Sequence, residues 1–125
     1  MQDDRRALGA EGETRAAEFL AIRGYRIVAR NVRVAGVEVD LIVRRGTLVA
    51  LVEVKTRRST AFGAPELAVD AAKRARLIRA GAAWLREHPG EARRFRFDVV
   101  TCRAPFHPPG RWRIDHWPGA FDAGD

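Results

Sequence analysis

The residues most able to do chemistry in this chain are two carboxylates and an amine between positions 40 and 55. Asp40 and Glu53 are the carboxylates, and Lys55 follows Glu53 by two positions. Since successive side chains of a β-strand point to opposite faces, Glu53 and Lys55 would emerge on the same face of a strand. Oxygen ligands favour hard divalent cations such as Mg²⁺ or Mn²⁺ over softer metals. The residue types therefore suggest a metal-dependent reaction with an amine beside the metal.

The segment 48–55, with the sequence LVALVEVK, is expected to form the strand that carries Glu53 and Lys55. It is apolar on both faces, which is typical of a strand covered on both sides. Val49 and Leu51 would share the face of Glu53 and Lys55, and the even-numbered residues would line the other face. A charge on such a strand costs several kcal/mol unless a counter-charge, hydrogen bonds or a metal compensates it. Some group must therefore meet Glu53.

A hairpin is predicted to bring Asp40 next to Glu53. A strand is expected over 36–43, and the turn 44–47 joins it to the strand 48–55. With the turn centred near Gly46, Asp40 lies opposite about position 53. Two carboxylates about 5 Å apart repel by roughly 3 kcal/mol at an effective dielectric near 20, and a divalent cation would offset this repulsion. A structural alternative stays open, in which Glu53 pairs with Lys55 and Asp40 points to solvent.

The first helix is predicted over 7–24 and contributes a third carboxylate. Its packing stripe, at spacings of three and four, consists of Gly9, Gly12, Glu13, Ala16, Ala17 and Leu20, and Gly24 is placed as a C-terminal cap. The small residues would let this helix approach the sheet closely and carry Glu13 inward. In the alternative, Glu13 lies at the edge of the stripe and reaches water, where it favours the dipole of the helix start.

Alternation and turn signals predict the remaining elements around this hairpin. Further strands are expected over 25–34, 93–102 and 112–117, and a second helix over 66–88. The apolar stripe of that helix would consist of Leu67, Ala71, Ala75, Ile78, Ala82 and Leu85, and Lys73 and Arg76 lie away from it. Within 36–43, one face would carry Val37, Val39, Leu41 and Val43, and the other Glu38, Asp40 and Ile42. The order predicts an α/β fold, αβββαβ plus a C-terminal strand.

The composition indicates one globular domain, 1–125, with a basic charge. Apolar residues make up 46% and charged residues 31% of the chain, which are globular values. No apolar run approaches the roughly 20 residues that span a bilayer, so a cytoplasmic protein without membrane contact is expected. The formal net charge is +7 and the pI is near 11.1, as in nucleic-acid binders, although genomic GC bias also favours arginine.

The order of elements resembles the PD-(D/E)XK nuclease core, a restriction-endonuclease-like fold with a central mixed β-sheet flanked by helices. Short blocks along nearly the whole chain are similar to the YraN-like family of bacterial proteins, which is described as endonuclease-like and related in arrangement to Holliday-junction resolvases. These blocks are Gly9–Glu13, Gly24–Asn31, Glu38–Ile42, Val52–Arg57, Phe62–Gly63, Ala68–Val69 with Lys73, Arg96–Val100 and Ala120–Phe121. Val37 is a departure, because the family usually has glycine there.

The resemblance implies roles for individual residues. Asp40 and Glu53 would bind Mg²⁺ or Mn²⁺ together with the backbone carbonyl of Val54. Lys55 would orient or help to deprotonate the attacking water, and Glu13 would complete the site. The expected contacts to phosphate are Thr56, Arg57 and Lys73. The roles of Glu38 and Asp98 stay open.

The function expected from these observations is a metal-dependent endonuclease that hydrolyses phosphodiester bonds of structured or branched DNA. The alternative is a basic nucleic-acid-binding module in which the same acids and lysine form a structural network and no bond is cut. Enzymes of this fold class that cut junctions are commonly dimers, so analogy alone points to a homodimer.

Overall fold

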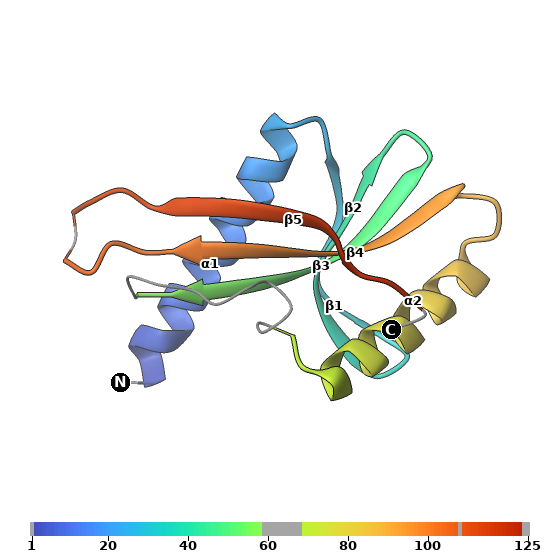
Figure 1. Cartoon of the computed structure of the whole chain (residues 1–125), viewed down its shortest axis with the longest axis horizontal. Helices are drawn as coiled ribbons and strands as arrows, with labels where there is room; N and C mark the ends of the chain where they lie inside the picture. Colours follow the sequence, from blue (N-terminus) through green and yellow to red (C-terminus); the bar gives the residue numbers. More distant parts are fainter. Residues whose placement is uncertain (1, 59–68, 108, 124–125) are drawn as a thin grey trace.

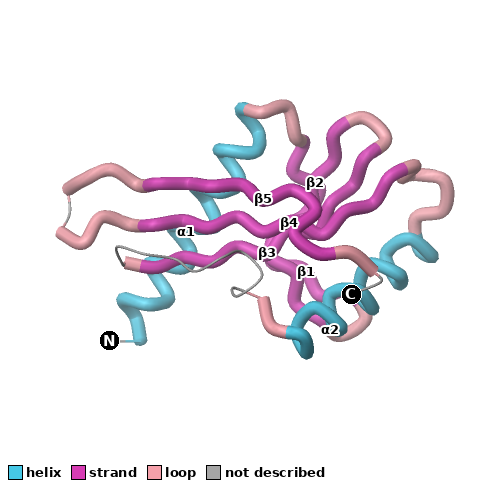
Figure 2. Tube along the Cα trace, viewed as in Figure 1, coloured by secondary structure: helices cyan, strands magenta, loops and turns pink. Residues whose placement is uncertain are grey.

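The described residues form a mixed five-stranded sheet with a helix on each face, an α/β fold. The structure, a computed structural model, describes residues 2–58, 69–107 and 109–123. Its elements are α1 (Gln2–Ile22), β1 (Arg26–Val34), β2 (Val37–Arg45), β3 (Leu48–Arg57), α2 (Ala71–Glu87), β4 (Arg94–Arg103) and β5 (Arg113–Phe121) (Figure 1). The strands lie in the order β1-β2-β3-β4-β5. All neighbours are antiparallel except β3 and β4, which α2 connects as parallel strands (Figure 2). This confirms the predicted fold class and order of elements.

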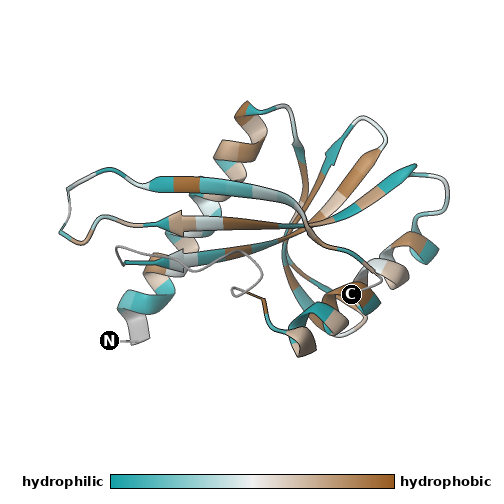
Figure 3. Cartoon of the chain, in the orientation of Figure 1, coloured by the Kyte–Doolittle hydropathy of each residue, from teal (hydrophilic) through white to brown (hydrophobic). Residues whose placement is uncertain are grey.

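The sheet has an apolar cluster on each face. On one face, α2 covers Val49, Leu51 and their neighbours, and on the other, α1 covers Ala50, Val52 and theirs. Figure 3 shows the apolar residues concentrated on the strands between the two helices. The alternation predicted for β3 is therefore confirmed, and Glu53 and Lys55 belong to the α2 face.

Helix α1 begins at Gln2, five residues before the predicted Ala7. Residues 2–6 include no apolar side chain, so periodicity could not reveal this extension, although acidic residues near a helix start favour its dipole. The predicted end is confirmed, because Gly24 has a φ of +90° and Tyr25 N donates to Leu20 O at 3.0 Å. Gly12 is buried where α1 crosses the end of β3, and a Cβ there would collide with Thr56.

Gly12→Ala should therefore destabilise the protein by about 1–3 kcal/mol, since either α1 or β3 must shift to admit the methyl group. The matched control is Gly9→Ala on the same helix, where a Cβ meets no atom within 4 Å. Gly9→Ala should stabilise the protein by up to about 1 kcal/mol through helix propensity. Urea denaturation of both variants measures the difference. Equal effects of the two substitutions would refute close packing at Gly12.

Helix α2 differs from its prediction in both its start and its buried face. Residues 66–68, which include Leu67 of the predicted stripe, lie outside the described residues. Val69 and Asp70 are described and are not helical. Asp70 is the N-cap, with Oδ1 accepting from Lys73 N at 2.8 Å. The predicted stripe is wrong, because Ala71, Ala75, Ala82 and Leu85 are exposed, Ile78 is half-buried, and the buried residues are Leu77, Ala80, Gly81, Ala83 and Trp84.

The physical reason is close packing against aromatic rings of β4. A Cβ on Gly81 would lie 2.9 Å from ring atoms of both Phe95 and Phe97, so glycine permits the approach and the helix rotates toward them. Lys73 precedes Leu77 by one helical turn and therefore lies in line with the buried face. Lys73 lies away from the predicted stripe, as expected, but the buried face is a different one, and this rotation directs Lys73 at Glu53.

Strand β2 changes face at Asp40. Val37 and Val39 lie in the cluster under α2 as expected for one row, but Leu41 and Val43 lie in the cluster under α1. The register places Asn31 of β1 opposite Asp40, and Asn31 has a φ of +49°, a left-handed conformation that asparagine tolerates. The prediction that Val37, Val39, Leu41 and Val43 share one face is therefore wrong, because the alternation of β2 reverses at Asp40.

Strand β5 continues through Pro118 and Gly119 to Phe121, four residues beyond the predicted end at Trp117. A register shift between Phe97 and Val99 of β4 accommodates the extra residues, and proline is tolerated because β5 is an edge strand. In β4, Phe95, Phe97 and Val99 share the face under α2.

Candidate functional site

The structure brings Asp40 and Glu53 together where β2 and β3 separate. The last paired residues of the two strands are Leu41 and Val52, so Asp40 and Glu53 occupy the next positions on the same face. Asp40 Oδ2 accepts a hydrogen bond from Val54 N at 2.8 Å. Because the N–H and C=O of one residue leave a strand on the same side, the Val54 carbonyl also faces the Asp40 edge.

Glu53 is the buried centre of this arrangement. It is 4% exposed, and its Oε1 accepts from Lys73 Nζ at 2.7 Å. Its Oε2 is buried and has no hydrogen-bond partner among the described residues. Burial, followed by the nearby Asp40 carboxylate, raises the pKa of Glu53 to about 7, although Lys73 opposes this. The alternative in which Glu53 pairs with Lys55 is wrong, because its ionic partner is Lys73.

The raised pKa gives a testable pH dependence in the absence of divalent cations. Between the ordinary pKa of 4.5 and the raised value of about 7, the folded chain binds more protons at Glu53 than the unfolded chain does. The free energy of unfolding should therefore fall as the pH rises through this window and level off above it. Urea denaturation at a series of pH values, with EDTA present, measures the slope.

Two substitutions test the assignment of this slope to Glu53. Glu53→Gln should flatten it, because the titrating group is gone. Glu91→Gln, which removes the exposed ion pair of Glu91 with Arg44 at 2.9 Å, should leave it unchanged. A slope that persists in Glu53→Gln would mean that another group carries the linkage.

The other predicted residues of β3 separate onto its two faces. Lys55 is half-buried on the face of Glu53, and no carboxylate in the described part of the chain forms an ion pair with it. Thr56 lies on the opposite face, beside Gly12 of α1 and hydrogen-bonded with Cys102 of β4. Arg57 is exposed at the end of the strand. The structure therefore groups Lys55 with the carboxylates and places the Thr56 side chain apart from them.

Glu13 approaches the same edge from α1. Burial raises its pKa, opposed by a hydrogen bond from Asn31, and Asp40 and Glu38 are near enough to add to the increase. The helix thus brings a third carboxylate toward Asp40, as the small residues of its stripe predicted. Asn31 was not assigned to this site from the sequence, because its position beside Asp40 follows from the observed pairing of β1 with β2.

The oxygen donors at this edge are of the kind that a hard cation prefers. Among the described residues no three Asp, Glu, His or Cys side chains already form a complete metal cage. Mg²⁺ usually needs only one or two carboxylates, with water and substrate phosphate completing its shell. Asp40, the Val54 carbonyl and the unpaired buried Oε2 of Glu53 supply that minimum. The residues present therefore fit Mg²⁺ or Mn²⁺.

Asp98 belongs to a different place. It lies on the α1 face of β4 and is hydrogen-bonded to Arg96 of the same strand, at 2.8 and 2.9 Å, and to Gly119 N at 2.9 Å. His116 Nε2 lies 2.8 Å from its Oδ2. Asp98 therefore takes no part in the cluster around Glu53.

Fold and site together define an α/β protein whose mixed sheet is consistent with a restriction-endonuclease-like core, with acids gathered where β2 and β3 diverge. No helix in the described ranges is long and apolar enough to cross a membrane. The model of the Uncharacterised protein family UPF0102 matches residues 12–102, which include Glu13, Asp40, Glu53, Lys55 and Lys73. The chain belongs to this family, which confirms the resemblance to YraN-like proteins.

Relatives in this family match over most of their length. The UPF0102 protein of Anaeromyxobacter dehalogenans is 45% identical over 120 residues, which cover 96% of this chain and 87% of the relative. That of Nocardia farcinica is 47% identical over 119 residues, covering 94% and 91%. That of Symbiobacterium thermophilum is 46% identical over 118 residues, covering 94% and 98%.

Proposed function

We propose that this protein is a metal-dependent endonuclease that hydrolyses phosphodiester bonds of DNA, with structured or branched DNA as the expected substrate. The observation that carries the proposal is the buried Glu53 beside Asp40, with one carboxylate oxygen unpaired among the described residues. Burying such an oxygen costs free energy unless a cation or donor meets it. The net charge of +7 supports a polyanionic substrate.

Each residue of the site has a role in this proposal. Asp40, Glu53 and the Val54 carbonyl would hold the cation, which when bound polarises a phosphoryl oxygen and lowers the pKa of a water. Lys55, on the face of Glu53 and without an ion-pair partner among the described residues, would orient that water and help to deprotonate it by stabilising the hydroxide that forms. Glu13 would complete the site from α1.

Substrate binding would rest on phosphate contacts. Arg57 is exposed at the end of β3, and the Lys73 side chain is 35% exposed while it pairs with Glu53. Contacts of this kind give affinity without reading sequence, which suits recognition of DNA by its shape. A homodimer in the cytoplasm belongs to the proposal by analogy with junction-cutting enzymes of this fold class.

A titration with Mn²⁺, followed by thermal unfolding, tests the cation site. At a Mn²⁺ concentration near 100 times Kd, the Tm should rise by about 10 °C. Asp40→Asn should remove this rise, whereas Asp115→Asn, which changes a carboxylate of β5 paired with Arg113, should retain it. If Mn²⁺ leaves the Tm of the wild type unchanged, the acids form a structural network and the protein is a basic nucleic-acid-binding module.

Cleavage itself is tested with linear, flapped, single-stranded and four-way DNA in Mn²⁺ or Mg²⁺. The proposal expects cutting of at least one form, most strongly a branched one, and none by Asp40→Asn. Binding of Mn²⁺ without cleavage of any of these DNAs would refute the endonuclease.

A further inference from the structure

An open polar groove extends outward from Asp40. It has a volume of about 360 Å³ and is lined by Gly36, Val37, Glu38, Asp40, Lys73 and Arg76. One side is the turn between β1 and β2 with the start of β2, and the other side is the first part of α2. Figure 1 shows this end of α2 beside the β1–β2 hairpin, and α2 contacts both strands. The groove therefore leads from solvent to the carboxylate that would hold the cation.

The two sides of the groove carry opposite charges. Glu38 and Asp40 come from β2, and Lys73 and Arg76 come from α2. Lys73 is engaged with Glu53 at 2.7 Å. Arg76 lies one turn further along α2, on the same side as Lys73. It is exposed, and among the described residues it has no ion pair or hydrogen bond. Arg76 is thus the cation of the groove that is free to bind an external anion.

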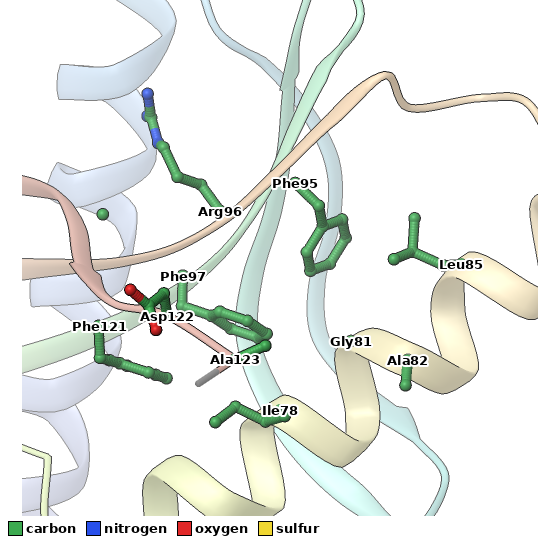
Figure 4. A pocket seen from close by; sticks show the side chains of 11 residues that line it. Ile78, Gly81, Ala82, Leu85, Phe95, Arg96, Phe97, Phe121, Asp122 and Ala123 are labelled. Carbon is green, nitrogen blue, oxygen red and sulfur yellow. The ribbon is translucent and has the colours of Figure 1, made fainter. Parts of the chain in front are cut away.

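A second cavity differs from this groove in being lined mainly by apolar side chains. It has a volume of about 460 Å³ and lies between α2, β4 and the end of β5. Figure 4 shows Ile78, Phe95, Phe97 and Phe121 around this cavity, with the side chain of Arg96 extending away from it. The one arginine of its lining, Arg96, is already paired with Asp98 at 2.8 Å. Of these two cavities, the groove at Arg76 is the better suited to phosphate.

We propose that the groove binds a phosphodiester of the DNA that lies next to the phosphodiester being cut. Arg76 contacts this phosphodiester, and Glu38 on the opposite side of the groove weakens its binding. The inference rests on the proposed function, because the cut phosphodiester is placed at Asp40 and Glu53. A guanidinium binds phosphate through two parallel hydrogen bonds. The Glu38 carboxylate, across the groove from Arg76, repels phosphate. Only DNA that is held by both Arg76 and the cation overcomes this repulsion, so correctly placed DNA is favoured over random contact.

The test measures binding of a fluorescein-labelled four-way DNA junction by fluorescence anisotropy, with Ca²⁺ in place of Mn²⁺ so that binding is separated from cutting. Arg76→Gln should weaken binding about fivefold, the effect of one exposed ionic contact. It should also reduce the slope of log K against log salt concentration by about 0.9. Glu38→Gln should strengthen binding by a similar factor. Arg86→Gln is the matched control, since Arg86 is exposed at the far end of the same helix.

The opposite signs at Arg76 and Glu38 distinguish a phosphate site from a general effect of charge or folding. Equal weakening by Arg76→Gln and Arg86→Gln would overturn the inference and indicate a diffuse basic surface. So would an unchanged or weaker affinity of Glu38→Gln. Thermal midpoints close to that of the wild type confirm that the variants fold. A junction that the wild type does not bind at all refutes this inference and the proposed function together, whereas binding without cleavage refutes only the latter.

Discussion

Replacing Lys55 by alanine should lower the rate of DNA cleavage by about 10²–10⁴-fold while leaving DNA affinity nearly unchanged. Lys55 shares the α2 face of β3 with Glu53, and no described residue forms an ion pair with it. Its ammonium is therefore available to a water or phosphate at the cation. The loss should appear in the single-turnover rate in Mn²⁺, with affinity measured separately in Ca²⁺.

Lys73→Met is the control that distinguishes an effect of the position of Lys55 from a general effect of losing a positive charge. Lys73→Met also removes one positive charge, but it takes away the ionic partner of Glu53 at 2.7 Å. In the absence of metal this leaves a buried carboxylate without counter-charge, so Lys73→Met should lower the Tm, whereas Lys55→Ala should not. A Lys55→Ala variant that cuts at nearly the wild-type rate would remove Lys55 from the reaction.

Local signals were sufficient to predict the arrangement of Asp40 and Glu53. The apolar run of β3 alternates without interruption, and a short turn at Gly46 sets the register of the hairpin, so two residues far apart in sequence had to meet. The same alternation carried the information that Thr56 lies on the face opposite Glu53 and Lys55. The phosphate contact that the family resemblance implies for Thr56 stays a prediction.

Features that depend on tertiary packing could not be predicted from the periodicity of apolar residues. Alanine and leucine positions predicted the wrong face of α2, because glycine at 81 and tryptophan at 84 determine which side reaches the Phe95 and Phe97 rings. The pairing of Lys73 with Glu53 follows from that rotation. Likewise, β2 changes face at Asp40, opposite Asn31, and the left-handed backbone of Asn31 is not visible in a strand pattern.

The network around Asp98 depends on a register that no local pattern contains. Gly119 N reaches Asp98 Oδ1 because β5 continues past Pro118 and its pairing shifts opposite Val99. Arg96 also donates to the Tyr25 hydroxyl at 2.9 Å, which ties β4 to the residue that follows α1. The network therefore joins three segments distant in sequence, and it holds β5 and the segment between α1 and β1 against β4.

Asp98→Ala should accordingly destabilise the protein by about 3–5 kcal/mol, the cost of removing one partner of a buried ion pair. Asp98 is 1% exposed, and the substitution leaves the largely buried Arg96 guanidinium and Gly119 N without their acceptor. The matched control is Asp115→Ala, which breaks the more exposed ion pair with Arg113 and should cost at most about 1 kcal/mol. Urea denaturation near neutral pH measures both.

Acid should reduce the difference between wild type and Asp98→Ala. Burial opposes the ionisation of Asp98, but hydrogen bonds from His116, Arg96 and Gly119 outweigh it and lower its pKa below the ordinary value. A carboxyl whose pKa is lowered on folding stabilises the protein above its unfolded pKa, and this stabilisation is lost as the pH falls through the folded pKa. The unfolding free energies of the two proteins should therefore converge as the pH falls below 3.8, the ordinary pKa of an aspartate, and through the lower folded pKa. A difference that stays constant into acid would show that Asp98 stabilises the fold by its shape rather than by its charge.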